Sequence, residues 1–208
     1  LRRAASLCLD FPSAQLDFIT FDGGHVKERS LNRTPLRPGV QSVGSIRGIS
    51  SHQHNPFVML CEPHADEDHG ICYGAALVYS GNFEAAAERA QFEDARLTLG
   101  IHPFHFCWTL EPGEVFTTPE AAMICSQQGF GQMSRQFHRA IREHLLRDVW
   151  KDRRKPVLVN SWEAAYFDFD TPKLLRLARE AADLGVELFV LDDGWFGHRN
   201  DDSSSLGD

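Results

Sequence analysis

The sequence lacks an excess of positive charge and lacks any long apolar run. It holds 21 Lys and Arg against 29 Asp and Glu in 208 residues, a formal net charge of −8 at pH 7. Nucleic acids and anionic membranes are bound by basic surfaces, and a membrane-spanning helix needs about 18 or more consecutive apolar residues. We therefore expect neither nucleic acid nor a membrane as a partner, whereas a neutral ligand such as a sugar is compatible with this charge.

The sequence also lacks paired cysteines. Its five cysteines are odd in number and scattered without a CxxC pair, which favours free buried thiols over a disulfide framework or a zinc site. His52 and His54 have the spacing of two ligands on one face of a strand, but packing in a polar loop is the interpretation we favour. The acidic segment "PHADEDHG" misses the spacing of a calcium loop. We expect no metal and no cofactor.

The two ends carry few signals of their own. The chain begins with Leu, and "LRRAASLCLDFP" lacks the apolar core and cleavage site of a signal peptide. It ends on the polar segment "SSSLGD". We interpret the chain as an internal fragment of a longer protein, and its compartment, cytoplasmic or secreted, stays open.

Residues 1–130 are punctuated by Gly and Pro and contain short runs of aromatic and branched residues, as strands do. The expected strands are "QLDFITFDGG", "PFVMLCE", "GAALVYSGNF", "ARLTLGI", "FHFCWTLEPGE" and "AAMIC". A short helical turn is expected only in "FEAAAERA". Many short strands at this spacing predict an antiparallel β-sandwich.

The hydrophobic period changes after residue 130. In "GQMSRQFHRAIREHLLRD", the residues Met133, Phe137, Ile141 and Leu145 recur every four positions, which places them on one face of a helix. We predict a connector helix between two domains over residues 131–152.

Residues 153–208 have the order strand, helix, strand. "KPVLVN" and "VELFVL" are the apolar strands, and "DTPKLLRLAREAADLG" is a helix with Thr171 as its N-cap, Pro172 in its first turn and Gly185 at its end. The crossover has the length that parallel strands require. Near-continuous apolar strands predict burial on both faces, as in a barrel or a doubly wound sheet. Of these two, we interpret the segment as the first part of a (β/α)8 TIM barrel.

Both predicted strands end in polar and aromatic residues. The first is followed by "NSWE", residues 160–163, and the second by "DDGW", residues 192–195. Carboxylates accept strong hydrogen bonds from hydroxyl groups, and tryptophan offers an apolar face to a sugar ring. These ends predict a carbohydrate subsite, with helix capping or metal binding by the aspartates as the alternative. Asp192 and Asp193 are poor candidates for a catalytic pair, because such carboxyls flank the scissile bond about 5–5.5 Å apart.

The longest of these segments resemble one enzyme family. "VNSWEAAYFDFDTPKLLRLAREAADLGVELFVLDDGWFGHRNDDSSSLGD" resembles the opening of the catalytic barrel in α-galactosidases (melibiases) of glycoside hydrolase family 36. "RTPLRPGVQSVGSIRGISSHQHNPF" and "DEDHGICYGAALVYSGNF" resemble the N-terminal β-sandwich of that family. The resemblance covers essentially the whole chain. It implies that residues 1–130 are the C-terminal part of the sandwich domain and residues 153–208 the truncated start of the barrel.

The resemblance also implies an activity and a set of binding residues. Family members hydrolyse terminal α-linked galactose, as in melibiose and raffinose, with retention of configuration. The galactose-binding residues of the family match Asp192, Asp193 and Trp162. A residue of the N-terminal domain that approaches the sugar falls at His25, where many members carry Trp.

The catalytic aspartates of the family lie in later barrel motifs that do not occur in this sequence. The chain alone is therefore expected to be inactive, since the double-displacement reaction needs both groups. The resemblance further implies a homo-oligomer. Two alternatives stay open, a galactosyltransferase of raffinose-type oligosaccharides and a non-catalytic galactose-binding module.

Overall fold

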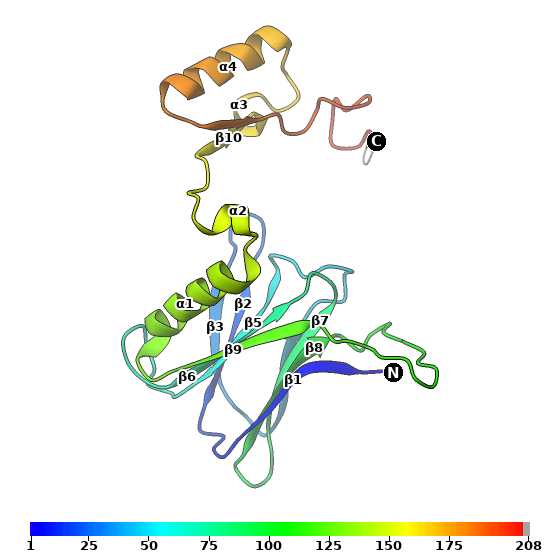
Figure 1. The fold of residues 1–208 in the computed structure, drawn as a ribbon, viewed down its shortest axis with the longest axis vertical. Helices are drawn as coiled ribbons and strands as arrows, with labels where there is room; N and C mark the ends of the chain where they lie inside the picture. The colour runs from blue at the N-terminus through cyan, green and yellow to red at the C-terminus, as the bar shows by residue number, and fades with distance from the viewer. Residues whose placement is uncertain (206–208) are drawn as a thin grey trace. The chain divides into compact units, whose positions relative to one another are not determined.

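A computed structural model describes residues 1–205 of the chain (Figure 1). The chain divides into two compact units, Leu1–His144 and Leu145–Asp208. Within the described residues, no helix is both long and apolar enough to span a membrane.

The first unit, all of which is described, consists of two antiparallel sheets and a helix. One sheet has the strand order β1-β8-β7-β4 and the other the order β3-β2-β5-β6-β9. Their bounds are β1 Ala4–Phe11, β2 Asp17–Asp22, β3 Ser30–Pro35, β4 Gly39–Gly44, β5 His54–Cys61, β6 Cys72–Val78, β7 Phe83–Arg89, β8 Ala95–Ile101 and β9 Glu120–Ser126. The predicted antiparallel architecture is thus confirmed for this unit.

Strand β5 contributes to two cores, because neighbouring residues of a strand point to opposite faces. Val58 and Leu60 belong to the core between the two sheets. Met59 and Cys61 belong to a second core, which includes Met133 of helix α1 (Gly129–Ala140). The five-stranded sheet is therefore covered on both faces, by the other sheet and by α1.

Helix α1 lies close to the sheet at a glycine of β6. A Cβ atom at Gly74 would lie 2.6 Å from Met133 Sδ and 2.7 Å from a ring carbon of Phe137. Both side chains are buried. The missing side chain at Gly74 is what allows the helix to approach the strands.

The predicted single helix over residues 131–152 is wrong in its length. Helix α1 ends at Ala140, a π-helical turn follows over Ile141–Leu145, and α2 spans Asp148–Lys151. Met133 and Phe137 face the core as predicted, whereas Ile141 and Leu145 are exposed. The wider turn changes the period of the helix, so the apolar face does not continue beyond Phe137.

Several strand predictions also need correction. "FEAAAERA" forms β7 rather than a helical turn, because Ala85 and Ala87 fill the core between the sheets and packing outweighs helix propensity. "FHFCWTLEPGE" is not a strand. It contains turns closed by Phe106 N–H to the Pro103 carbonyl (3.2 Å) and Glu114 N–H to the Glu111 carbonyl (3.0 Å). The strands β1, β3 and β4 were not predicted.

The prediction of buried thiols holds for two cysteines only. Cys61 and Cys72 are buried, and burial raises the pKa of the Cys61 thiol to about 11. The other three are exposed, namely Cys8, Cys107 and Cys125. All five are free.

The second unit contains the predicted strand, helix and strand. Its further elements are β10 Leu158–Asn160, α3 Trp162–Ala165, α4 Thr171–Asp183 and β11 Leu188–Val190. Strands β10 and β11 are parallel. They are not buried on both faces, which corrects the prediction, because each has a single sheet neighbour among residues 1–205 and α4, described in full, buries none of its side chains.

Helix α4 begins one residue earlier than predicted. Asp170 is the N-cap, and its carboxylate accepts a hydrogen bond from Lys173 N–H at 2.8 Å. At the other end, Gly185 has φ +86°, and Val186 N–H donates to the Ala181 carbonyl at 3.0 Å. These contacts form the Schellman end that a glycine permits. The predicted stop at Gly185 is confirmed, and Thr171 is the first helical residue rather than the cap.

Candidate functional site

The two strand ends of the second unit lie next to each other. The parallel register pairs Asn160 with Val190. Ser161 joins the ends directly, because its N–H donates to the Val190 carbonyl (3.0 Å) and its Oγ accepts from Asp192 N–H (3.1 Å). Ser161 is fully buried. The polar segments that follow β10 and β11 therefore meet at one edge of the sheet.

The aspartates turn the chain after β11. Asp192 Oδ1 accepts a hydrogen bond from Asp193 N–H at 2.9 Å, and Asp193 Oδ1 accepts one from Gly194 N–H at 2.7 Å. Gly194 has φ +91°, and a Cβ there would lie 3.0 Å from the Phe169 ring and 3.1 Å from the Phe167 ring. Glycine is needed at this position both for its φ and for the space.

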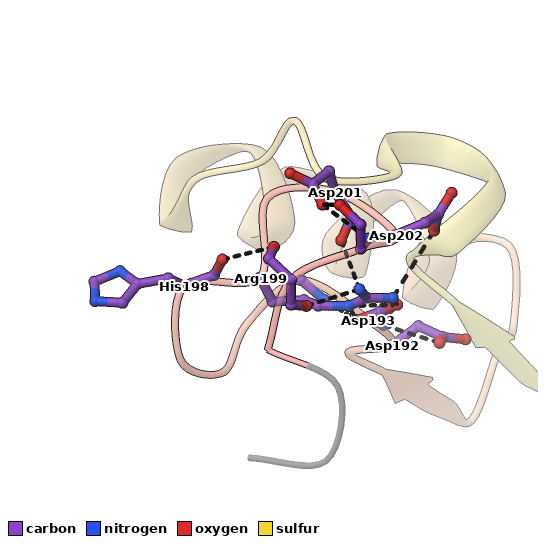
Figure 2. Close-up of polar contacts among 9 residues, drawn as sticks. Asp192, Asp193, His198, Arg199, Asp201 and Asp202 are labelled. Carbon is purple, nitrogen blue, oxygen red and sulfur yellow. Dashed lines mark hydrogen bonds and ion pairs between the residues drawn. The ribbon is translucent and has the colours of Figure 1, made fainter.

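Arg199 binds the carboxylate of Asp193 from the loop that follows (Figure 2). Its Nη2 donates to Asp193 Oδ2 at 2.8 Å, and its Nε donates to Oδ1 at 2.9 Å. Such a two-point arginine–carboxylate contact fixes both groups in one plane. Figure 2 shows His198 directed away from this pair.

The guanidinium of Arg199 is itself held on all sides. Its Nη1 donates to the carbonyls of Asp201 (2.5 Å) and Ser204 (2.9 Å). The group lies over the Phe167 ring, 5.4 Å from its centroid, and Arg199 is only 6% exposed. A buried arginine with these partners is a fixed part of the site.

The ion pair also shifts the pKa of Asp193. The hydrogen bonds from Arg199 lower the pKa of Asp193 from its ordinary value, partial burial opposes them, and the Gly194 N–H acts in the same direction as Arg199. An aspartate is already ionised at neutral pH, and the lowered pKa keeps Asp193 ionised in more acidic solution than an ordinary aspartate.

An open cleft of about 460 Å³ lies at these residues. It is lined by Val190, Leu191, Asp192, Asp193, Phe196 and Arg199. Clefts of this volume, with apolar walls and a few convergent polar groups, are typical of small-ligand sites. Two hollows of the first unit, of about 470 and 650 Å³, lack paired carboxylates at their walls.

Trp162 starts helix α3 directly after Ser161. Its ring packs edge-on against Tyr166 (centroids 5.2 Å apart) and Phe167 (5.0 Å). It is not among the residues that line the cleft. Trp162 contacts the same phenylalanine that supports Arg199, and its contact with a sugar stays a prediction.

His25 belongs to the first unit. It is exposed in the turn between β2 and β3, where Val26 has φ +65° and Gly24 N–H donates to the Lys27 carbonyl (3.2 Å). The other three predicted binding residues belong to the second unit, so the role of His25 at the sugar also stays a prediction.

The histidine and acidic motifs have local partners. His54 Nδ1 lies 3.1 Å from Asp22 Oδ1, and Asp66 Oδ1 accepts from the N–H groups of Asp68 (2.9 Å) and His69 (2.7 Å). Over residues 1–205, no three His, Cys, Asp or Glu side chains are grouped as a metal ion would require.

Two residues of the site were not predicted as functional. Ser161 was noted only as part of a polar strand end, and Arg199 was treated as part of a polar loop. A signal for Arg199 exists, since it is the only Arg or Lys among residues 191–208, which contain five aspartates. A single cation among so many carboxylates is expected to pair with one of them.

Comparison with known proteins gives the family. The model of the glycosyl hydrolase family 36 N-terminal domain matches residues 1–111, and the melibiase model matches residues 115–208. The α-galactosidase AgaA of Geobacillus stearothermophilus is 52% identical over the whole chain, which covers 28% of that protein. The bifunctional α-galactosidase/sucrose kinase AgaSK of Mediterraneibacter gnavus is 50% identical, and the chain covers 22% of it.

Solved structures agree with these matches. The crystal structure of AgaA superimposes with a TM-score of 0.95 over 100% of this chain and 29% of that one. An AgaA variant in complex with stachyose gives a TM-score of 0.94 at 51% identity, over 100% of this chain and 29% of that one. The chain thus spans less than a third of the length of these relatives. On two family models that together match nearly all of its residues, the chain belongs to glycoside hydrolase family 36.

Proposed function

We propose that this chain is part of an α-galactosidase that releases terminal α-linked galactose from oligosaccharides of the melibiose and raffinose type. The observation that carries the proposal is the pair Asp192–Asp193 in an open cleft at two adjoining strand ends. The printed names of the relatives support it, because AgaA is called an α-galactosidase and its variants were solved with stachyose and raffinose.

In this proposal, residues 1–130 belong to the N-terminal sandwich, residues 131–152 connect, and residues 153–208 begin a (β/α)8 barrel. Active sites of such barrels form at the C-terminal ends of the strands, where β10 and β11 carry their polar residues. The parallel pair and its helical crossover support this assignment. The catalytic nucleophile and acid/base are proposed to lie outside these 208 residues.

The chain's own contribution to the reaction is to bind and orient the sugar. Asp192 Oδ1 accepts from a backbone N–H, and within the described part of the chain no donor contacts its Oδ2. An ionised carboxylate oxygen with an open acceptor position binds a sugar hydroxyl strongly. The Asp192 carboxylate is therefore proposed to hold a galactose hydroxyl while groups elsewhere in the protein act on the glycosidic bond.

The test is product analysis with the full-length protein that contains this chain. Incubation with raffinose is expected to give free galactose and sucrose, with the galactose first released as the α-anomer in proton NMR. Asp192→Asn should abolish most of this release, whereas Asp183→Asn, on an exposed residue of α4, should not. Longer galactosides as the main product would instead identify a transferase, and binding without cleavage would identify a binding module.

Homo-oligomerisation stays a prediction of the family resemblance. Analytical ultracentrifugation of the full-length protein tests it, and a sedimentation coefficient of a single subunit at micromolar concentration would contradict it.

A further inference from the structure

We propose that Arg199 is a positioning residue that holds Asp193 in the orientation in which it binds the ligand. The inference rests on the proposed function and adds a role to a residue outside the paired aspartates. It starts from a difficulty of the site. Two adjacent carboxylates at one strand end repel each other, and the single backbone hydrogen bond that each accepts leaves the plane of its carboxylate free to rotate.

The contacts of Arg199 remove both difficulties for Asp193. The guanidinium places a positive charge against the carboxylate, with Nη2 at 2.8 Å from Oδ2 and Nε at 2.9 Å from Oδ1. Two parallel hydrogen bonds fix the rotation of the carboxylate plane, which a single bond would leave free. A lysine would supply the charge without the second bond.

Arg199 can act in this way because it is ordered independently of any ligand. Two carbonyls, those of Asp201 and Ser204, and the Phe167 ring hold the guanidinium from the sides that Asp193 does not occupy. Phe167 in turn packs against Trp162. A side chain that is already ordered loses little conformational entropy when the ligand binds, so the affinity is higher.

The hydrogen bonds divide the roles of the two aspartates. Asp193 already accepts from Gly194 N–H and from two nitrogens of Arg199, out of about four acceptor positions on a carboxylate. Asp192 accepts only from Asp193 N–H within the described residues. Asp192 therefore presents the more open carboxylate, and Asp193 presents a fixed one.

The same contacts join the loop over residues 198–205 to the site. His198 N–H donates to Ser205 Oγ (3.0 Å) and Ser204 Oγ donates to the His198 carbonyl (3.0 Å), so the loop closes on itself around Arg199. Loss of the guanidinium removes the link between this loop and Asp193. We therefore expect the loop to lose order together with the ligand-binding geometry.

The experiment compares Arg199→Met and Arg199→Lys with the unchanged full-length protein. The ligand is 1-deoxygalactonojirimycin, which is bound to an AgaA variant in a solved structure, and its Kd is measured by calorimetry. Kd is expected to rise about tenfold or more for the Met variant, because a hydrogen bond to a charged group is lost. A smaller rise is expected for the Lys variant. Arg176→Met, on an exposed residue of α4, is the matched control and should leave Kd unchanged.

A pH series separates positioning from mere structural support. Affinity should fall in acid as Asp193 becomes protonated, and this fall is the acidic limb of binding. Because Arg199 lowers the pKa of Asp193, the acidic limb should move to higher pH in Arg199→Met and return toward its original position in Arg199→Lys. Circular dichroism at each pH must show a folded protein across the limb, because acid unfolding of a destabilised variant would also move it. If the Met variant does not fold, the Lys variant tests the positioning role. A raised Kd with an unchanged acidic limb is then the expected result.

The outcomes distinguish this inference from the proposed function. An unchanged Kd and an unchanged acidic limb in both variants of a protein that hydrolyses raffinose would overturn the positioning role alone. A full-length protein that neither binds 1-deoxygalactonojirimycin nor releases galactose would overturn the proposed function, and the positioning role with it.

Discussion

Each of the two units of the chain has its own kind of internal contact. In Leu1–His144, the cores between the sheets and beneath α1 consist of apolar side chains, many of them fully buried. In the described part of the second unit, the buried residues are Ser161, Ala165 and Arg199, and two of these three are polar residues of the candidate site. The second unit thus buries its polar site residues rather than an apolar core.

Because of this difference, the two units should be sensitive to different kinds of substitution. An apolar core responds to changes in side-chain volume, because interiors are closely packed. A polar site responds to the loss of a donor or acceptor, because a buried group without a partner costs free energy whatever its volume. A substitution that removes side-chain volume should therefore destabilise the first unit more than the second. A substitution that removes a hydrogen-bond donor or acceptor should destabilise the second unit more than the first.

The largest stability effect is expected in the core between the sheets. Leu97 is 0% exposed there. Leu97→Ala should lower the free energy of unfolding by about 2–5 kcal/mol, since it removes buried apolar volume and leaves a cavity. Urea unfolding measures the change, and Phe92→Ala, at a side chain that is 83% exposed, should stay within about 0.5 kcal/mol of the unchanged protein.

A smaller effect is expected where α1 meets the sheet. Gly74→Ala adds a carbon at 2.6 Å from Met133 Sδ and 2.7 Å from the Phe137 ring, so these two buried side chains must shift and disturb the packing of α1, at a cost of about 1–3 kcal/mol. Faster amide hydrogen exchange in α1, with β7 unaffected, is the expected signature. Unchanged exchange in α1 would contradict the account of why this helix lies close to the strands.

In the second unit, the cap of α4 provides a polar counterpart. Asp170→Ala removes the acceptor for Lys173 N–H and should cost about 1 kcal/mol of helix stability. Asp170→Asn keeps a capping oxygen and should cost less. Thermal unfolding followed by circular dichroism compares the two variants, and equal losses would contradict the capping role.

The smallest expected effect is the pH response of Asp193. Its pKa is lower in the folded protein than in the unfolded chain, chiefly because of Arg199. The resulting stabilisation is fully present above the unfolded value, about 3.9, and is lost as pH falls through the folded value. Carboxyl-carbon NMR titration should therefore place Asp193 below ordinary aspartates, and an ordinary midpoint would contradict the ion pair.

The sequence predicts elements whose pattern is local. The parallel strands, the helix over Thr171–Asp183 and its glycine stop follow from periodicity and end signals. Strand β7 could not be predicted in this way, because its three alanines favour a helix until the sheets pack around them. The bend after Ala140 escaped because an apolar repeat does not reveal a π-helical turn.

The candidate site was predictable to the same extent. Asp192 and Asp193 stand at the end of an apolar strand, which any reading of the sequence finds. Arg199 could not be assigned to Asp193 rather than to Asp201 or Asp202, because the choice depends on how the loop folds back. Ser161 joins the strand ends only once the parallel register is known.

The central claim is that the Asp192–Asp193 strand end binds galactose. The most direct measurement is the calorimetric Kd of 1-deoxygalactonojirimycin, which has been observed bound to an AgaA variant, for the full-length protein and for Asp192→Asn. We predict clear binding by the unchanged protein and a Kd at least about tenfold higher for the variant. Equal affinity in both proteins would contradict the claim.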